Sequence, residues 1–157
     1  MPSSAWKKKE ESPTLIIAEI GINHLGDEKL CSDMIIAAVE AGADCVKLQT
    51  GNADESFHPD NISYSTFKGN ELSRESLIRL SELSKKKGSY LFSSPGDFSS
   101  LKLLSSISSE AYKISSGQFT NIPLIEEIIK ENMPIIFSTG MADEKDIKRI
   151  VDLCKKH

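Results

Sequence analysis

The chain has 157 residues, of which 39% are hydrophobic and 27% are charged. This length and composition predict one domain with a core of its own, and they exclude a disordered tail, a collagen-like repeat and a disulfide-dense miniature. A formal net charge of -4 argues against a surface that neutralises nucleic-acid phosphates, so we expect no nucleic-acid partner.

Residues 1–14 are polar and contain no apolar segment typical of a signal peptide. Lys7, Lys8 and Lys9 are followed directly by Glu10 and Glu11, which indicates a solvated N-terminal arm rather than a targeting or nucleic-acid patch. No stretch of the chain approaches the roughly 20 apolar residues of a membrane span. We therefore expect a cytoplasmic protein with no membrane partner.

The chain contains three cysteines, Cys31, Cys45 and Cys154. Their number is odd, and no pair has the spacing of a CxxC metal motif. This usage is typical of a reducing compartment and predicts buried, structural thiols rather than a disulfide framework.

From residue 15 onward, short apolar runs alternate with segments of helical period, the pattern of βα units that build a parallel sheet. The predicted strands cover residues 15–20, 44–49, 89–94, 111–115 and 134–139. The predicted helices cover residues 28–40, 74–87, 98–107, 122–131 and 144–155. The segment from Thr50 to Ser73 is a long loop rich in Asn, Ser, Asp and Gly, and such loops in α/β folds commonly form functional lids or rims.

Polar side chains interrupt the apolar strands near the same end each time. They are Glu19, Asn23, His24, Lys47, Gln49, Ser93, Ser94, Lys113, Ser115, Ser116, Gln118, Ser138 and Thr139. Because the carboxyl ends of parallel strands face one crevice, we expect these residues to surround a single pocket. Two lysines, several hydroxyls and glycine turns at Gly117 and Gly140 favour a phosphorylated or carboxylated substrate.

Each of these residues also has a structural interpretation. Lys47 and Lys113 can extend along the sheet to reach solvent, and Glu19 can be a structural ion-pair partner of either lysine. His24 is explained as well by a loop or helix-cap role as by metal binding, because no second ligand stands at metal spacing beside it. The sequence contains no P-loop, no Ser-His-Asp arrangement and no paired-cysteine zinc motif.

Several runs in the chain resemble the sialic acid synthase family, which comprises N-acetylneuraminate synthases and relatives that make legionaminate, pseudaminate and spore-coat sugars. The runs are IAEIGINH at residues 17–24, AGADCVKLQT at 41–50, YKISSG at 112–117, NIPL at 121–124 and FSTGM at 137–141. The resemblance extends over nearly the whole chain from Leu15, with the motifs in the family's order.

The resemblance implies a TIM barrel that condenses phosphoenolpyruvate with an open-chain N-acyl hexosamine such as N-acetylmannosamine. Carbon 3 of phosphoenolpyruvate attacks the sugar aldehyde, water adds at carbon 2, and inorganic phosphate is released. The product is a nine-carbon 2-keto acid. A divalent metal, Mn²⁺ or Mg²⁺, polarises the aldehyde in the full enzyme. The positions that match the phosphoenolpyruvate-binding residues are Lys47, Ser94, Lys113, Ser116 and Ser138.

Further roles are implied by the same resemblance. Glu19 matches the carboxylate of the first strand beside the metal and the sugar, and together with Lys47 and Lys113 it forms the expected catalytic set. Asn23 and Gln118 are the expected sugar-binding residues. At Gln118 the family usually has an acidic residue, and a neutral amide can form hydrogen bonds but cannot act as a base.

The family's metal-binding histidines lie on later strands, and an antifreeze-like domain follows the barrel, so we expect no metal ligands in this chain. A complete (β/α)₈ barrel typically needs about 250 residues. We therefore expect an α/β fold in which residues 15–157 form an incomplete TIM barrel of about five βα units with a parallel sheet. This part would supply the phosphoenolpyruvate-binding half and have little or no synthase activity alone.

Two alternatives remain at this stage. The chain can be a non-catalytic half barrel that binds an anion, or that assembles with a complementary chain or a second copy through the open edges of the first and fifth strands. It can also be a phosphoenolpyruvate-condensing barrel of the keto-deoxy sugar acid type, although the AEIG and Asn23-His24 motifs fit that group less well.

Overall fold

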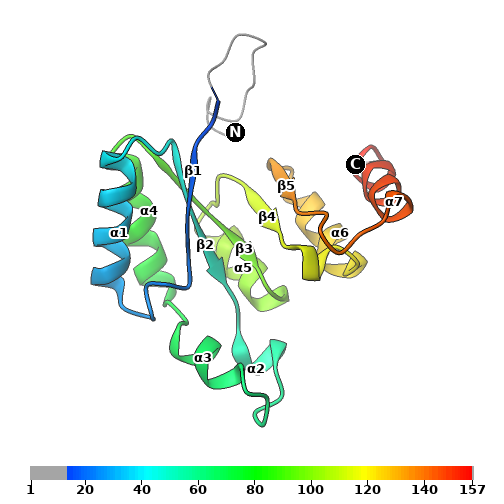
Figure 1. The fold of residues 1–157 in the computed structure, drawn as a ribbon, viewed down its shortest axis with the longest axis horizontal. Helices are drawn as coiled ribbons and strands as arrows, with labels where there is room; N and C mark the ends of the chain where they lie inside the picture. Colours follow the sequence, from blue (N-terminus) through cyan, green and yellow to red (C-terminus); the bar gives the residue numbers. More distant parts are fainter. Residues whose placement is uncertain (1–13, 157) are drawn as a thin grey trace.

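The computed structural model describes residues 14–156, and all but the last residue of the predicted N-terminal arm lie outside that range. Five parallel strands form one sheet whose spatial order follows the chain (Figure 1). They are β1 (Ile17–Gly21), β2 (Cys45–Thr50), β3 (Tyr90–Pro95), β4 (Tyr112–Ile114) and β5 (Ile135–Phe137). Parallel strands that follow one another in the sheet and are linked by helices are typical of a (β/α) barrel. The predicted α/β class with about five βα units is therefore confirmed.

The five predicted helices are all present between or after the strands. They are α1 (Glu28–Glu40), α4 (Arg74–Lys86), α5 (Phe98–Ser106), α6 (Ile122–Lys130) and α7 (Glu144–Cys154). Each begins after an Asp, Ser or Asn whose side chain accepts a hydrogen bond from a backbone N–H of the first turn. These caps satisfy N–H groups that have no partner inside the helix, which explains where the helices start.

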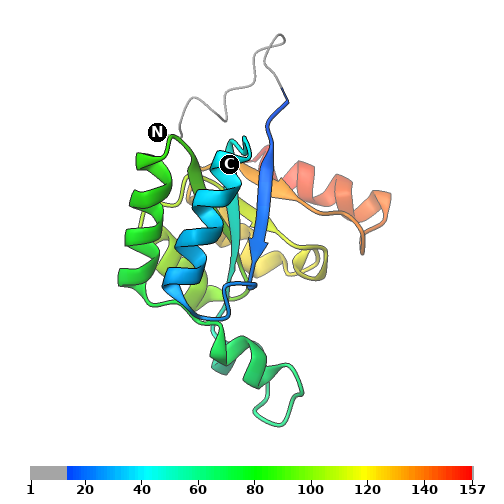
Figure 2. The same ribbon diagram turned by 60° about the vertical axis from the view of Figure 1, so that its left-hand side comes forward.

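Alternation along the strands separates two faces of the sheet. Leu48 and Leu91 pack in a cluster with Ile35 and Leu77 of helices α1 and α4, which lie side by side in Figure 2. A second helix-facing cluster joins β4 to α6 and α7. The third cluster contains only residues of the strands or directly beside them, such as Phe92. The sheet therefore has an outer face covered by helices and an inner face, as in a barrel.

Three strands are shorter than the sequence predicted, β1 by one residue and β4 and β5 by more. β4 contains Tyr112–Ile114 rather than residues 111–115, and β5 contains Ile135–Phe137 rather than residues 134–139. Within the described residues, β5 has only β4 as a strand neighbour, so few backbone groups there are paired in a ladder. Apolar runs show where a strand can form, whereas its length depends on the neighbours that it finds.

The segment predicted as a loop between Thr50 and Ser73 contains two short helices, α2 (Ala53–Ser56) and α3 (Tyr64–Gly69). In Figures 1 and 2 they lie beyond the carboxyl end of β2. Helices of four and six residues are too short for an amphipathic period to show in the sequence, which is why they were not predicted. Within residues 14–156, no helix combines the length and the apolarity needed to cross a bilayer.

Candidate functional site

The inner face of the sheet carries an ion pair between neighbouring strands. Glu19 on β1 and Lys47 on β2 are register partners, and the Lys47 Nζ atom lies 2.7 Å from Glu19 Oε2. Lys47 is only 6% exposed, whereas the Glu19 side chain is half exposed. Lys47 also donates a hydrogen bond of 3.2 Å to Ser94 Oγ on β3. Lys47 is therefore a buried, charged group with its partners in place, and it does not snorkel to solvent.

A second lysine lies on the same face at β4. The Nζ atom of Lys113 donates hydrogen bonds of 2.6 Å to Ser138 Oγ and 2.9 Å to the Ile114 carbonyl. Burial lowers the pKa of Lys113 below its ordinary value, the positive charge of Lys47 lowers it further, and Glu19 opposes both effects. The described residues give Lys113 no ion-pair partner within 4.0 Å. The pKa shift therefore places both lysines and Glu19 in one electrostatic environment.

This arrangement favours an anion on the inner face. Lys47 and Lys113 carry two positive charges, and Glu19 supplies one negative charge, so one positive charge is not balanced by these three groups. The hydroxyls of Ser94 and Ser138 already touch the two ammonium groups and can donate to a bound oxygen. A phosphate or carboxylate would gain charge-assisted hydrogen bonds from both lysines.

Ser116 lies in the turn after β4, next to the loop that follows β5. A Cβ atom added to Gly140 would lie 3.9 Å from the Cβ atom of Ser116. Ser116 therefore lies close to the loop that follows β5, the loop that also contains Ser138. A direct role of Ser116 in anion binding stays a prediction.

Gln118 has two specific hydrogen bonds. Its Nε2 donates to the Gly96 carbonyl at 2.8 Å, and its Oε1 accepts from Asn121 Nδ2 at 2.8 Å. A carboxylate could not make the first of these bonds, because it has no proton to donate. Gln118 therefore ties the loop after β3 to the turn before α6. The hydrogen bond to the Gly96 carbonyl gives a structural reason for an amide side chain at position 118.

Asn23 and His24 belong to the tight loop between β1 and α1. Asn23 Nδ2 donates to the Ile20 carbonyl at 2.8 Å, so its amide stabilises the local turn. His24 is fully buried, and its Nδ1 accepts a hydrogen bond of 3.1 Å from the backbone N–H of Gly26. Burial lowers the pKa of His24. The contacts favour the loop interpretation of His24, and the sugar-binding role of Asn23 stays a prediction.

Ser93 and Thr139 were both expected at the pocket, and both lie away from it. Thr139 borders a separate groove beside α6 and α7. Ser93 is buried, and its Oγ lies 2.7 Å from Thr50 Oγ1. It is the register partner of Leu48, which packs against helices α1 and α4. Side chains alternate along a strand, so Ser93 and Ser94 point to opposite faces, and Ser94 is the one that contacts Lys47.

A cavity of about 330 Å³ adjoins Ser94 at the carboxyl ends of the strands. Segment 50–73, which the sequence marked as a rim, supplies much of its wall. The lining residues are Ile22, Gln49, Thr50, Gly51, Asn52, Ala53, Ser56, Phe57, Phe67, Asn70, Ser94, Pro95, Gly96, Ser115 and Gln118. Sequence reasoning identified the segment by its composition but missed Asn52, Phe57, Phe67 and Asn70 individually, since none of them interrupts a strand.

Carboxylates support this wall from behind. Asp97 Oδ2 accepts hydrogen bonds from the Asn52 N–H at 2.7 Å and from Ser56 Oγ at 2.9 Å. Glu71 Oε1 accepts from the Ala53 N–H at 2.8 Å. These bonds fix the backbone of the segment at the points where it borders the cavity.

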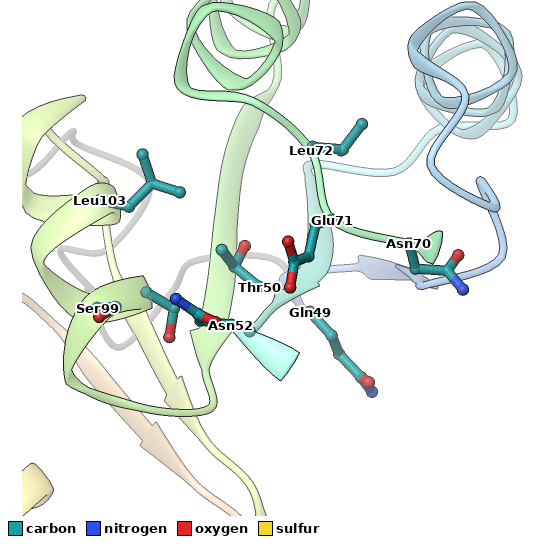
Figure 3. A pocket seen from close by; sticks show the side chains of 10 residues that line it. Gln49, Thr50, Asn52, Asn70, Glu71, Leu72, Ser99 and Leu103 are labelled. Carbon is teal, nitrogen blue, oxygen red and sulfur yellow. The ribbon is translucent and has the colours of Figure 1, made fainter. Parts of the chain in front are cut away.

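A smaller cavity of about 190 Å³ shares Thr50, Gly51 and Asn52 with the first and also borders Ser99 and Leu103 of α5. Figure 3 shows the Glu71 side chain beside Thr50 and Asn52, while Gln49 points away from Glu71. Gln49 and Thr50 border both cavities, so the end of β2 forms a wall that the two cavities share.

The described residues do not fit a metal centre. No group of three or more His, Cys, Asp or Glu side chains in residues 14–156 could hold a metal ion. Glu19 is the acidic group closest to the lysines, and it is already paired with Lys47. We therefore assign no step of the chemistry to a metal held by these residues.

Comparison with known proteins gives a consistent result. The sequence profile of the NeuB family matches residues 34–157. The chain is 35% identical over 156 residues to the N,N'-diacetyllegionaminic acid synthase of Legionella pneumophila, covering 90% of this chain and 44% of that protein. It is 28% identical over 158 residues to human N-acetylneuraminate-9-phosphate synthase, covering 92% of this chain and 44% of that protein.

A solved structure is similar in fold as well as in sequence. The N-acetylneuraminic acid synthetase of Leptospira borgpetersenii, solved in complex with citrate, superposes with a TM-score of 0.88 at 34% identity. The match covers 92% of this chain and 51% of that one. The chain thus spans less than half the length of the curated relatives described above and about half of this solved chain.

Proposed function

The chain belongs to the NeuB family, and from this premise we propose that it forms the phosphoenolpyruvate-binding half of a sialic acid synthase-type active site. Phosphoenolpyruvate carries a carboxylate and a phosphate on adjacent atoms. The observation that carries the proposal is the pair of lysines on one face, each hydrogen-bonded to a serine hydroxyl that lies in the next strand or directly after it. Two anionic groups on one small molecule match two cationic groups on one sheet.

In the proposed reaction, phosphoenolpyruvate condenses with an N-acyl hexosamine. Carbon 3 of phosphoenolpyruvate forms a bond to carbon 1 of the open-chain sugar, and the aldehyde oxygen takes up a proton to become a hydroxyl. Positive charge develops at carbon 2, and water adds there and loses a proton. The new hydroxyl at carbon 2 then releases its proton to the departing phosphate as the bond between carbon 2 and the phosphate oxygen breaks, which yields inorganic phosphate and a 2-keto acid.

The residues of this chain have binding and positioning roles in that scheme. Lys47 and Lys113 hold the anionic groups, with Ser94, Ser116 and Ser138 as hydroxyl donors. Glu19 is half exposed beside Lys47, so its carboxylate can both orient the lysine and be reached by a ligand. The development of positive charge at carbon 2 is favoured by such a nearby carboxylate.

Sugar binding is proposed for the amide side chains at the rim. Gln118 lines the cavity beside Ser94 and can offer a hydrogen bond to a hydroxyl but cannot remove a proton. Asn23 lies in the loop after β1 near the same end of the sheet. Any base that the reaction needs would therefore be Glu19 or a group outside these amides.

The proposal is tested by calorimetric titration of the protein with phosphoenolpyruvate, inorganic phosphate and pyruvate. We expect phosphoenolpyruvate to bind at least about tenfold more tightly than either of the others, because only it engages both lysines. Equal affinity for phosphoenolpyruvate and phosphate would contradict the proposal and indicate a general anion site.

A second candidate role is assembly with a complementary polypeptide. An apolar groove of about 810 Å³ lies beside β5, α6 and α7, and its walls include Phe137, Ile147 and Ile150. The outer edge of β5 has no strand neighbour within the described residues. Size-exclusion chromatography with light scattering tests this role. A concentration-dependent dimer or larger species supports it, and a monomer at all concentrations argues against self-association through this edge.

A further inference from the structure

Lys113 differs from the other inner-face lysine in its partners. Lys47 forms an ion pair of 2.7 Å with Glu19, whereas the described residues place no carboxylate oxygen within 4.0 Å of Lys113 Nζ. The two hydrogen bonds of Lys113 both run to neutral oxygens, Ser138 Oγ at 2.6 Å and the Ile114 carbonyl at 2.9 Å. From this difference we propose that Lys113 is a covalent site for 2-keto acids, at which its amine forms a reversible imine with the keto carbon.

The hydrogen bonds of Lys113 suit a neutral amine. A neutral amine has two N–H groups and one lone pair, whereas the ammonium has three N–H groups and no lone pair. Two oxygens, Ser138 Oγ and the Ile114 carbonyl, accept hydrogen bonds from Lys113 Nζ. They satisfy both N–H groups of the neutral form, so the lone pair is left to attack a carbonyl carbon. Loss of a proton from Lys113 therefore breaks no ion pair and keeps both hydrogen bonds.

The surroundings of Lys113 also favour the neutral amine. Burial lowers the pKa of Lys113, the positive charge of Lys47 on β2 lowers it further, and Glu19 on β1 opposes both effects. The contact from the β5 side is the Ser138 hydroxyl, which carries no charge. Lysines that are partly desolvated and close to a second cation are the ones that form imines in enzymes. Lys47 differs, because loss of its proton would break its ion pair with Glu19.

The two lysines together indicate the chemical class of the ligand. A 2-keto acid carries a carboxylate next to a ketone carbon, so the charged Lys47 would bind the carboxylate while the neutral Lys113 attacks the ketone. Ser94 contacts Lys47 and also lines the cavity of about 330 Å³, so this cavity adjoins the lysine pair. The product of the proposed reaction is itself a 2-keto acid, and an imine would slow its release. That consequence alone rests on the proposed function.

Imine formation needs no co-reactant beyond a proton from solvent. The Lys113 nitrogen forms a bond to carbon 2 of the keto acid, and a proton passes from nitrogen to the former ketone oxygen. The resulting hydroxyl takes up a second proton from solvent, the bond between carbon 2 and this oxygen breaks, and water leaves. The product is a protonated imine, which water hydrolyses back to the amine and the keto acid.

The test is reduction of the imine in place. The folded protein is incubated with pyruvate, sodium borohydride is added, and the labelled lysines are mapped by peptide mass spectrometry. Borohydride delivers hydride to the imine carbon and leaves a carboxyethyl group on the nitrogen. We expect Lys113 to be labelled at least about tenfold more than an exposed, paired lysine such as Lys29. No label at Lys113, or equal labelling of Lys113 and the exposed lysines, overturns the inference.

Variants test the site and its electrostatic basis. Lys113→Arg keeps a positive charge but removes the amine, so the main label should disappear, whereas the matched control Lys29→Arg should keep it. Glu19→Gln removes the carboxylate that opposes the lowering of the Lys113 pKa. At a fixed pH near neutrality, we expect this variant to raise the label at Lys113 by about twofold or more. A folded Glu19→Gln protein with no more label than the unchanged protein would contradict the electrostatic basis.

Phosphoenolpyruvate separates this inference from the proposed function. If both lysines hold phosphoenolpyruvate, its presence should protect Lys113 from labelling by pyruvate. Label at Lys113 that phosphoenolpyruvate does not reduce contradicts the proposed function and leaves the imine site supported. Binding of phosphoenolpyruvate by a protein that gives no label at Lys113 overturns the imine site alone.

Discussion

Glu19 and Lys47 face each other across the first two strands and form an ion pair of 2.7 Å on the inner face of the sheet. The lysine is buried, so its charge is costly without a partner. The carboxylate is half exposed and remains open to a ligand. The pair therefore has two roles, since it stabilises a buried cation and also limits the positive charge that the inner face offers to an anion.

The first prediction follows from these opposing roles. Glu19→Gln should lower the free energy of unfolding by about 1–2 kcal/mol. This loss is smaller than that for a fully buried ion pair, because Glu19 is half exposed. The same variant should bind phosphoenolpyruvate more tightly, because two positive charges then face the ligand without a carboxylate. Urea unfolding and calorimetric titration measure the two effects. Weaker binding by the folded variant would show that Glu19 contacts the ligand favourably.

The second prediction concerns the pH dependence of binding. The pKa of Lys113 is lowered from 10.5 by burial and by Lys47, so Lys113 loses its proton at a lower pH than an ordinary lysine. The affinity for phosphoenolpyruvate should therefore fall as pH rises through this lowered pKa. In Lys113→Arg the decline should move to higher pH, because a guanidinium stays protonated.

Titrations between about pH 7 and pH 10 check this second prediction. Lys29→Met, which removes an exposed lysine on α1, serves as the control and should keep the profile of the unchanged protein. An identical decline in Lys113→Arg would mean that another group causes it.

The third prediction concerns stability in mild acid. Burial lowers the pKa of His24 below its ordinary value of 6.5. Below about pH 6.5 the unfolded chain takes up a proton that the folded protein resists, so stability falls as pH decreases from that point toward the lowered pKa. His24→Asn, whose oxygen can replace Nδ1 as the acceptor for Gly26, should show a flatter dependence between about pH 7 and pH 5.

Unfolding by urea at several pH values gives the slope for this third comparison. His58→Asn changes a histidine whose side chain is 78% exposed, and this control should leave the slope as it is. Equal slopes for His24→Asn and the unchanged protein would assign the acid sensitivity to carboxylates.

The fourth prediction tests the amide at position 118. In Gln118→Glu the introduced carboxylate cannot donate to the Gly96 carbonyl and instead repels it, so the free energy of unfolding should fall by about 1–2 kcal/mol near neutral pH. The loss should shrink at low pH, where a protonated carboxyl can donate. Thermal or urea unfolding at two pH values measures it. A stable variant at neutral pH would show that this contact adds nothing.

The sequence predicted the elements of this fold well because each one has a local cause. The helices start at capping residues such as Asp27 and Asp97, which can be recognised in the sequence by residue type. The strands are β-branched runs between turn residues. The lengths of β4 and β5 were wrong, because pairing with neighbours decides them and no local signal reports it.

Side-chain direction separates what could be predicted in the site from what could not. Lys47, Ser94, Lys113 and Ser138 interrupt apolar strands, and the structure brings them together. Ser93 was expected beside Ser94, but alternation turns it to the helix-facing side. Phe57, Phe67 and Asn70 come from short helices and their ends, where neither strand period nor helix period identifies them.

The central claim is that the two inner lysines bind phosphoenolpyruvate, and its most direct test is the dissociation constant of this ligand for Lys113→Met compared with Lys29→Met. Lys113 is the better choice for substitution because it is only partly buried and pairs with no carboxylate in the described part of the chain, so the fold should tolerate the change. We predict that Lys113→Met weakens binding by about tenfold or more, while Lys29→Met binds like the unchanged protein. A folded Lys113→Met protein with unchanged affinity for phosphoenolpyruvate would contradict the account.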